Sequence, residues 1–538
     1  MRHGKRYLSL LLALLWLLSL LACAQQPEQE QQESLSLRLA YVQTPETLDP
    51  AMVTSGIERT LVSHLFENLM QLSADGVQSG AARSYVCTDN LDGTETYTFS
   101  LREGLQWSDG TALTAHDFVY AWRRLVSPDT ASPNREILNV VSGYEQAAYG
   151  DPEALQVTAE DAQTLVVQLN CHCPYFLTEI CCDASTMPVR KDLVQKGIWA
   201  ANGGPFCTNG IYRLKTWTAE QIVLEKDEKF DLIPVAPASL TFLFTETASR
   251  ALQLYKGGQA DFVMNIGNFE NAVKIFCPDS TYLIVNQMAE NLKSQSLRQA
   301  MNLVIDRNEV AKIMGNGYVA AKGLVPEGVH ISNGYVHFRG SNGILVDNDQ
   351  EHYEDNCAKA QELLKEAGYS RKELNALGNI TLLCQNSTSQ QYLAQYIQKT
   401  WQDKLFLTVT VMGVSEDQWQ ECLQNGEFSL ALLTTIPRGS DAMEYLKDFA
   451  TGETKNYGLY SNTAYDLLMR TAAQSGSPEA RDAYLEDAER LLLESGYVMP
   501  LCGRETAYLL RPELTGVFDN GLNQCYFTNI TTVSEGMP

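Results

Sequence analysis

Basic residues are in short supply in this chain of 538 residues. It has 40 lysine and arginine residues against 65 aspartate and glutamate residues, which gives a formal net charge of −25. Proteins bind the phosphates of nucleic acids with clustered lysine and arginine side chains, and no such cluster occurs here. We therefore exclude nucleic acid as a partner and interpret the acidic surface mainly as a source of solubility.

Patterns typical of catalytic and metal sites are also missing. The seven histidines are scattered, and the sequence contains no HExxH, GxSxG or P-loop pattern. The segments Cys171-His172-Cys173 and Cys181-Cys182 resemble a metal cluster at first sight, but their spacing matches none of the usual zinc patterns. We therefore predict no enzymatic activity, no bound metal and no cofactor.

Only one apolar run approaches the length of a membrane span, and it lies at the N-terminus. Three basic residues precede the 15 residues from Leu8 to Ala22, which fall short of the roughly 20 that a spanning helix needs. This pattern is typical of an export signal, residues 1–22, cleaved after the small residue Ala22. Cys23 follows directly, and a cysteine there resembles the lipidated cysteine of bacterial lipoproteins.

The segment after Cys23 is rich in glutamine and glutamate up to residue 34. Such a segment cannot bury apolar surface, so residues 23–34 are predicted to form a flexible tether. We expect the chain to be lipid-anchored at a bacterial cell membrane, with everything after Cys23 outside the cytoplasm. Disulfides persist there, so we expect local disulfides among the twelve later cysteines, with unpaired thiols as the alternative.

About 500 residues follow the tether, too many for a single hydrophobic core, so two or three lobes are expected. Apolar periodicity predicts strands and helices that alternate, which indicates a mixed α/β architecture. The predicted strands are 34–42, 96–104, 380–384, 407–413 and 428–435. The predicted helices are 115–125, 296–313, 357–367, 390–402 and 478–495. The polar stretch 326–349 is interpreted as a surface loop.

Motifs along most of the chain after the tether resemble those of the family 5 extracellular solute-binding proteins, in the same order. Each motif alone is weak, but their number and order make chance resemblance improbable. The motifs are LDP (48–50), HLFENL (64–69), DGTETYTFSLREGLQWSDGTALTAHDFVYAWRR (92–124), SPDTASP (127–133), NGIYRLKTW (209–217), YKGGQADFV (255–263), SLRQAMNLVIDRNEV (296–310), GLVPEG (323–328), YSNTAYDLL (460–468) and VMPL (498–501).

The resemblance implies a large three-domain, two-lobe fold of the type II periplasmic-binding-protein class. Domain I would comprise residues 35–67, 174–279 and 499–538. Domain II would be residues 68–173 and domain III residues 280–498. The two lobes would close about a hinge over a bound solute.

The resemblance also implies which segments line the ligand site. In peptide-binding members an extended peptide pairs with protein strands. By position, the loop Thr54-Ser55-Gly56 and the strand end that includes Thr434, Thr435 and Ile436 resemble the segments that line that site.

One position departs from the peptide-binding pattern. Arg438 stands where those members place the aspartate that binds the α-ammonium group of the ligand. An arginine suits a carboxylate instead. Asp441, three residues later, would replace the missing aspartate or act only as a surface cap.

These features predict the substrate-binding lipoprotein of an ABC transporter. It would capture peptides or a related small solute and deliver them to the permease and ATPase subunits of the importer, acting as a monomer. Two alternatives stay open, namely a receptor that senses peptides without transport, and a binder of a non-peptide ligand such as a metal chelate, haem or a sugar.

Overall fold

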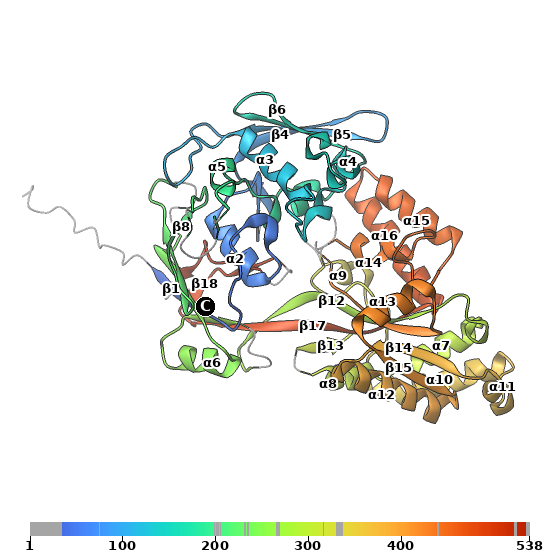
Figure 1. Cartoon of the computed structure of the whole chain (residues 1–538). Helices are drawn as coiled ribbons and strands as arrows, with labels where there is room; N and C mark the ends of the chain where they lie inside the picture. The colour runs from blue at the N-terminus through green and yellow to red at the C-terminus, as the bar shows by residue number, and fades with distance from the viewer. Residues whose placement is uncertain are drawn as a thin grey trace, which may run out of the picture.

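The chain folds into two lobes that lie side by side and are joined by two long strands (Figure 1). This computed structural model describes residues 35–533 except residues 75, 198, 201–203, 205, 231–232, 234–235, 265–268, 316, 330–336, 438–440 and 521–523. Lobe 1 is built around a hydrophobic core whose residues run from Leu37 to Ile275 and from Tyr508 to Ile530. Lobe 2 contains two cores with residues between Tyr282 and Cys502.

One sheet runs through both lobes and contains eleven strands of the described chain. Its strand order is β15-β14-β16-β12-β17-β11-β1-β10-β9-β8, and β13 pairs with β17 off this path. The bounds are β1 Ser36–Tyr41, β8 Tyr212–Trp217, β9 Gln221–Lys226, β10 Ser239–Phe244, β11 Phe262–Met264, β12 Val273–Val285, β13 Tyr318–Ala320, β14 Ile380–Gln385, β15 Val409–Val414, β16 Leu430–Thr435 and β17 Val498–Leu510.

Strands β12 and β17 make the connection between the lobes. Each has 13 residues, and they pair antiparallel with register shifts between Cys277 and Ser280 and between Thr281 and Tyr282. Pro278 lies within the first shift and has no N–H to donate to the ladder, so pairing is interrupted there. Such bulges let paired strands bend, and these lie between the two cores, where the resemblance predicts a hinge.

Lobe 1 carries a second, smaller sheet with the order β4-β5-β7-β6. In β5 every second residue is buried, as expected for a strand with one face on the core. Helices α2 and α3 belong to the same core, and α6 lies beside β1 and β11. The bounds are β4 Ala82–Asp89, β5 Glu95–Leu101, β6 Val157–Ala159, β7 Thr164–Leu169, α2 Gly56–Leu65, α3 Ala115–Val126, α4 Tyr144–Ala148 and α6 Ala248–Lys256.

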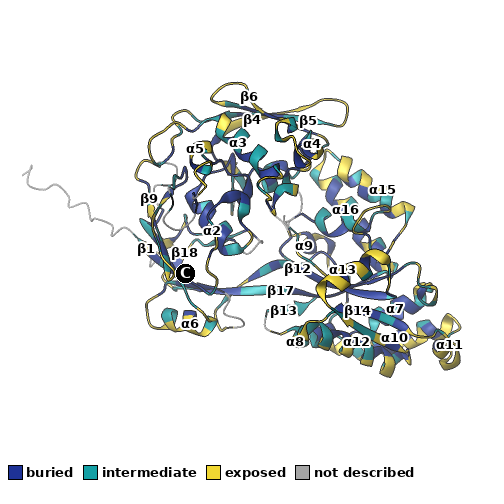
Figure 2. Cartoon of the chain, in the orientation of Figure 1, coloured by how far each residue is buried: buried dark blue, intermediate teal, exposed yellow. Residues whose placement is uncertain are grey.

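Lobe 2 places helices on both faces of its part of the large sheet. Strands β14 and β16 are mostly buried, whereas the edge strand β15 and the outer faces of several helices are partly exposed (Figure 2). One core lies under α7, α10 and α12, and the other lies under α13, α15 and α16. The bounds are α7 Gln295–Leu303, α8 Arg307–Met314, α9 Phe338–Asn342, α10 Tyr353–Glu366, α11 Arg371–Ala376, α12 Thr388–Leu405, α13 Glu416–Asn425, α14 Met443–Leu446, α15 Thr463–Gln474 and α16 Pro478–Glu494.

The structure corrects two interpretations of the sequence. The predicted helix 296–313 is two helices, α7 and α8. The Asp306 side chain accepts hydrogen bonds from the N–H groups of Asn308 and Glu309 and so caps the N-terminus of α8. The stretch interpreted as a surface loop contains α9, in which Phe338 and Arg339 are buried. Among the described residues, no helix combines the length and the apolar character that a membrane crossing requires.

Candidate functional site

The predicted loop Thr54-Ser55-Gly56 leads into α2 and is held by one carboxylate. Glu58 accepts hydrogen bonds from the backbone N–H groups of Glu46 (2.9 Å), Thr54 (2.8 Å) and Ser55 (3.0 Å). Burial raises the pKa of the Glu58 carboxyl, but these donors outweigh that effect and leave its pKa below the ordinary value. The loop is therefore fixed, and the Thr54 residue at its start is exposed.

The preceding residues tie this loop to the part of lobe 1 that includes the smaller sheet. Asn134 donates a hydrogen bond from its side-chain amide to the carbonyl oxygen of Val53 at 2.7 Å. Arg59 on α2 donates to the side chains of both Asn134 and Asp183. These contacts join segments far apart in the sequence into one rigid surface.

The second predicted segment lies at the end of β16 in lobe 2. Thr434 and Thr435 pair with Thr281 and Ser280 of β12, next to the bulges. The Thr435 hydroxyl lies 2.7 Å from the hydroxyl of Tyr282, and the Ile436 residue beyond it is 66% exposed. This strand end is therefore attached directly to the predicted hinge.

Asp441 is not a surface residue. It is 6% exposed, and Arg481 of α16 donates two hydrogen bonds to its carboxylate at 2.8 and 2.9 Å. The N–H of Met443 donates to the same carboxylate. The negative charge is thus already neutralised within lobe 2, which weighs against Asp441 as the group that binds a ligand ammonium. Arg438 lies outside the described residues.

A cavity of about 330 Å³ lies between the lobes at this position. Lobe 2 contributes Asp441 and residues of α14 and the turn that follows it. The guanidinium of Arg481 lies over the Tyr175 ring of lobe 1, 5.3 Å from its centroid, beside the cavity. The lining residues are Glu136, Ile137, Asn139, Val140, Asn170, Tyr175, Glu179, Ile180, Asp441, Met443, Glu444 and Lys447.

The lining has an acidic character. Four of its side chains are carboxylates, namely Glu136, Glu179, Asp441 and Glu444, and Lys447 forms an ion pair with Glu444. Burial raises the pKa of the Tyr175 hydroxyl, and the nearby carboxylates raise it further, so Tyr175 is a neutral hydrogen-bonding group at pH 7.

Of the predicted site residues, Asp441 lines this cavity. The loop 54–56 and the strand end 434–436 are not among its described lining residues and belong to different lobes. Glu136, Tyr175 and Glu179 were missed, because nothing in the local sequence indicates that lobe 1 residues face α14, more than 260 positions later. Closure about β12 and β17 would bring the two lobes nearer to each other.

The cysteines correct another prediction. All twelve that follow Cys23 are unpaired in the structure, so the predicted local disulfides are wrong. Cys173, Cys181 and Cys182 are buried, and burial raises the pKa of each thiol well above its ordinary value. They pack as small apolar side chains. The Nδ1 atom of His172 contacts the Glu95 carboxylate, and no described group of three or more His, Cys, Asp or Glu side chains is placed to hold a metal ion.

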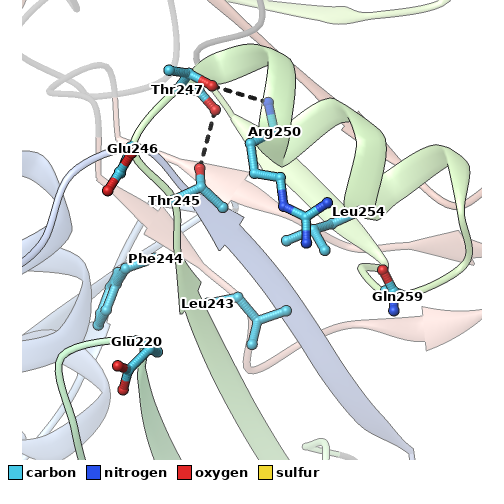
Figure 3. A pocket seen from close by; sticks show the side chains of 9 residues that line it. All are labelled: Glu220, Leu243, Phe244, Thr245, Glu246, Thr247, Arg250, Leu254 and Gln259. Atoms are coloured by element: carbon cyan, nitrogen blue, oxygen red, sulfur yellow. Dashed lines mark hydrogen bonds between the residues drawn. The ribbon is translucent and has the colours of Figure 1, made fainter.

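A larger hollow of about 620 Å³ lies on lobe 1, beside α6 (Figure 3). Thr247 accepts a hydrogen bond from the N–H of Arg250 and so caps this helix, and Glu246 and Glu220 lie on the other side of the hollow from Gln259. All of its lining residues belong to lobe 1, so closure of the lobes cannot enclose it. The cavity between the lobes is therefore the better candidate for a solute site.

Comparisons with known proteins agree with this two-lobe geometry. Residues 76–457 match the pattern of bacterial extracellular solute-binding proteins, family 5 Middle. Three relatives from Escherichia coli (strain K12) each align with 88% of this chain. The periplasmic murein peptide-binding protein MppA is 26% identical, with 88% of its length aligned. The periplasmic oligopeptide-binding protein OppA (87% aligned) and the probable deoxycholate-binding periplasmic protein YgiS (88% aligned) are each 27% identical.

Solved structures of MppA resemble the chain to different degrees. Its unliganded open form gives a TM-score of 0.80 at 25% identity, covering 93% of this chain and 98% of that one. A second structure of the Escherichia coli protein gives 0.65 at the same identity, covering 94% and 99%. Identity and coverage are nearly the same in the two comparisons, and the higher TM-score belongs to the unliganded open form. The chain belongs to the bacterial extracellular solute-binding proteins of family 5.

Proposed function

We propose that this protein is the extracytoplasmic substrate-binding component of an ABC importer and that it captures peptides by closing its lobes over them. The observation that carries the proposal is the cavity whose walls come from both lobes, next to paired strands that bend between them. An enclosed solute would contact both lobes and so stabilise the closed state, which the permease can distinguish from the open one. The names of the relatives MppA and OppA support a peptide as the solute.

The carboxylate-rich lining favours a ligand that carries positive charge near lobe 1. Asp441 would serve mainly to hold Arg481 and the start of α14, rather than to bind the ammonium group. The relative YgiS is named for deoxycholate, so an anionic, non-peptide ligand is the competing possibility for this family.

A lipid anchor would keep the protein near its permease. Cys23 follows an apolar run of 15 residues, and acylation of its thiol would attach the chain to the outer face of the cytoplasmic membrane. Radiolabelled palmitate should be incorporated into the protein in its native host and should not be incorporated after Cys23→Ser. Labelling of the variant to the same extent would disprove the anchor.

Ligand-induced stabilisation tests the solute. The chain from Ala24 onward would be stripped of ligand by partial unfolding and refolded, and its melting temperature measured with peptides that have free or acetylated N-termini, and with deoxycholate. A ligand at about 100 times its dissociation constant stabilises a protein by about 2.7 kcal/mol, which gives a clear shift. A rise in melting temperature with peptides that have free N-termini supports the proposal. A rise with deoxycholate and none with any peptide would show that the solute resembles a bile acid and is not a peptide.

A matched pair of variants locates the binding site. Ile436 and Ile344 are both in lobe 2 and are 66% and 67% exposed, so arginine at either position should leave the fold intact. Ile436→Arg should abolish the peptide-induced shift, because it places a long cation on the strand end expected to line the site, and Ile344→Arg should preserve the shift. Equal shifts in both variants would remove residues 434–436 from the site.

A further inference from the structure

The edge strand β4 of the smaller sheet in lobe 1 is unusually exposed. It lies at one end of the order β4-β5-β7-β6, in the upper part of lobe 1 in Figure 1. Every residue from Arg83 to Asn90 is exposed, whereas its neighbour β5 buries alternate residues. Backbone N–H and C=O groups along the free side of such a strand are available to pair with another strand.

The sequence of β4 does little to block such pairing. Proteins commonly protect edge strands with lysine, proline or inward-pointing charges, and Ala82–Asp89 contains neither lysine nor proline. Its charged residues, Arg83 and Asp89, lie near the two ends, and the five residues between them are uncharged. No described residue forms an ion pair with Arg83.

The face of β4 that continues the core side of the sheet is uncovered. Tyr85 lies opposite Phe99 and Cys87 lies opposite Tyr97, so both share the face of the buried β5 residues. The Tyr85 ring contacts those of Tyr97 and Phe99, with centroids 6.1 and 6.0 Å apart, yet Tyr85 remains 42% exposed. On the opposite face Val86 is 63% exposed. An additional strand beside β4 would bury part of this surface.

We propose that β4 is a dimerisation edge, where two copies of this chain pair their β4 strands antiparallel about a twofold axis at Val86. The occupant is a second copy because the strand is complementary to itself in this register. Arg83 then lies opposite Asp89 of the other copy, twice in each dimer, and Tyr85 lies opposite Cys87. Ser84 lies opposite Thr88, and Val86 meets its own counterpart.

The register centred on Val86 is favoured over registers in which one β4 strand is shifted along the other. Opposite charges and β-branched or aromatic residues placed directly across a pair of strands stabilise the pairing, and a shift of two residues in either direction separates both ion pairs. The two small sheets join into one continuous sheet of eight strands, and the contact is isologous, as twofold symmetry requires. The contact area is small and both copies are acidic, so the dimer is weak and concentration-dependent. This replaces the monomer expected from the sequence and does not rest on the proposed ligand.

A charge exchange tests the register. The chain from Ala24 onward would be studied by sedimentation velocity over a wide range of protein concentrations. R83D and D89R should each weaken the dimer by about tenfold or more, because each creates two like-charge contacts. The double variant R83D/D89R restores both opposite-charge pairs and should recover the wild-type dissociation constant. K365D, at an exposed position of α10 in lobe 2, makes the same charge change as R83D and should have no effect.

A crosslink tests the axis independently of charge. In a Cys87→Ser background, V86C places two thiols directly opposite each other, within the separation of paired strands that a disulfide can bridge. T88C is the matched control, because its counterpart would lie four residues along the strand, roughly 13 Å away. Mild oxidation should link V86C into dimers on a non-reducing gel and leave T88C as monomers. A wild-type chain that stays monomeric at every concentration, a dimer insensitive to R83D, or equal crosslinking of the two cysteine variants would each overturn the proposal.

Discussion

The two lobes bury ionisable side chains of different kinds. In lobe 2 the buried cations are arginines, and carboxylates or carbonyl oxygens surround them. The side chains of Arg339 and Glu489 are 3% and 0% exposed, and the side chains of Arg481 and Asp441 are 1% and 8% exposed. In lobe 1, His64 at the end of α2 and Glu67 just beyond it are buried groups that titrate within a few pH units of neutrality.

The two lobes should therefore differ in how their stability responds to pH and to the loss of a charged partner. An arginine stays charged over the whole physiological range, so the buried arginine pairs of lobe 2 should be insensitive to pH and intolerant of the loss of a partner. The groups at the end of α2 exchange protons with solvent when the protein unfolds, so lobe 1 should respond to pH. Each side of this comparison can be tested by removing one group at a time.

Glu489 is the position where loss of a partner should cost most. Its carboxylate accepts hydrogen bonds from Arg339, from Asn342 and from the backbone N–H groups of Leu324 and Val325. It therefore joins α16 to α9 and to the segment before it. Glu489→Ala leaves the buried Arg339 charge without a carboxylate to neutralise it, and such a change typically costs about 3–5 kcal/mol.

Urea unfolding of lobe 2 would measure this loss. The control is Glu290→Ala, which removes an exposed ion pair with Lys293 and should cost less than about 1 kcal/mol. If Glu489→Ala lowers the free energy of unfolding no more than the control does, the Glu489 carboxylate is not the centre of a stabilising network. The buried arginines of lobe 2 would then not be intolerant of the loss of a partner.

The pattern of the sequence predicted many of the helices and strands but not the contacts that join them. Apolar periodicity predicted the helix at 478–495, and the structure confirms α16 at Pro478–Glu494 with Ser477 as its N-cap. The long strand β12 was not predicted, because Pro278 in its middle is typical of a turn or a loop. Its place in the sheet depends on pairing with β17, more than 200 residues later.

The candidate site was harder to predict than the fold. A polar stretch such as 326–349 is ordinarily exposed, and the ion pair with Glu489 on a distant helix helps to make the burial of Arg339 favourable. In the same way Asp441 is a plausible ligand group in the sequence, and its pairing with Arg481 becomes visible only when α16 is placed beside it. The local sequence pattern therefore predicts helices and strands. Contacts between segments far apart in the sequence decide which charged side chains can still bind a ligand.

In lobe 1, burial lowers the pKa of His64 to about 4. Its ring is neutral, since Nε2 accepts a hydrogen bond from the N–H of Phe527 and Nδ1 donates to the carbonyl oxygen of Thr60. The unfolded chain takes up a proton at this histidine below pH 6.5, whereas the folded chain does not until about pH 4. The free energy of unfolding therefore falls as the pH drops through this window, by about 3 kcal/mol in total.

Glu67 acts in the opposite direction. Burial raises the pKa of its carboxyl to about 7, even though it forms an ion pair with Arg102. The unfolded chain releases this proton above pH 4.5 and the folded chain only near pH 7, so the free energy of unfolding falls as the pH rises through that range, by about 3 kcal/mol. Between pH 4.5 and 6.5 the contributions of His64 and Glu67 should largely cancel.

Replacing Glu67 or His64 alone should reveal how much each contributes to the pH dependence of the free energy of unfolding. Glu67→Gln removes one titration, so its stability relative to the wild type should increase as the pH rises from 4.5 to 7. His64→Gln should show the reverse trend from pH 4 to 6.5, and the exposed control Glu290→Gln should run parallel to the wild type. The measurement is urea unfolding at half-unit pH steps. Parallel curves for all three variants would mean that neither group at the end of α2 changes its protonation on unfolding, and that the contrast with the arginines of lobe 2 does not extend to pH.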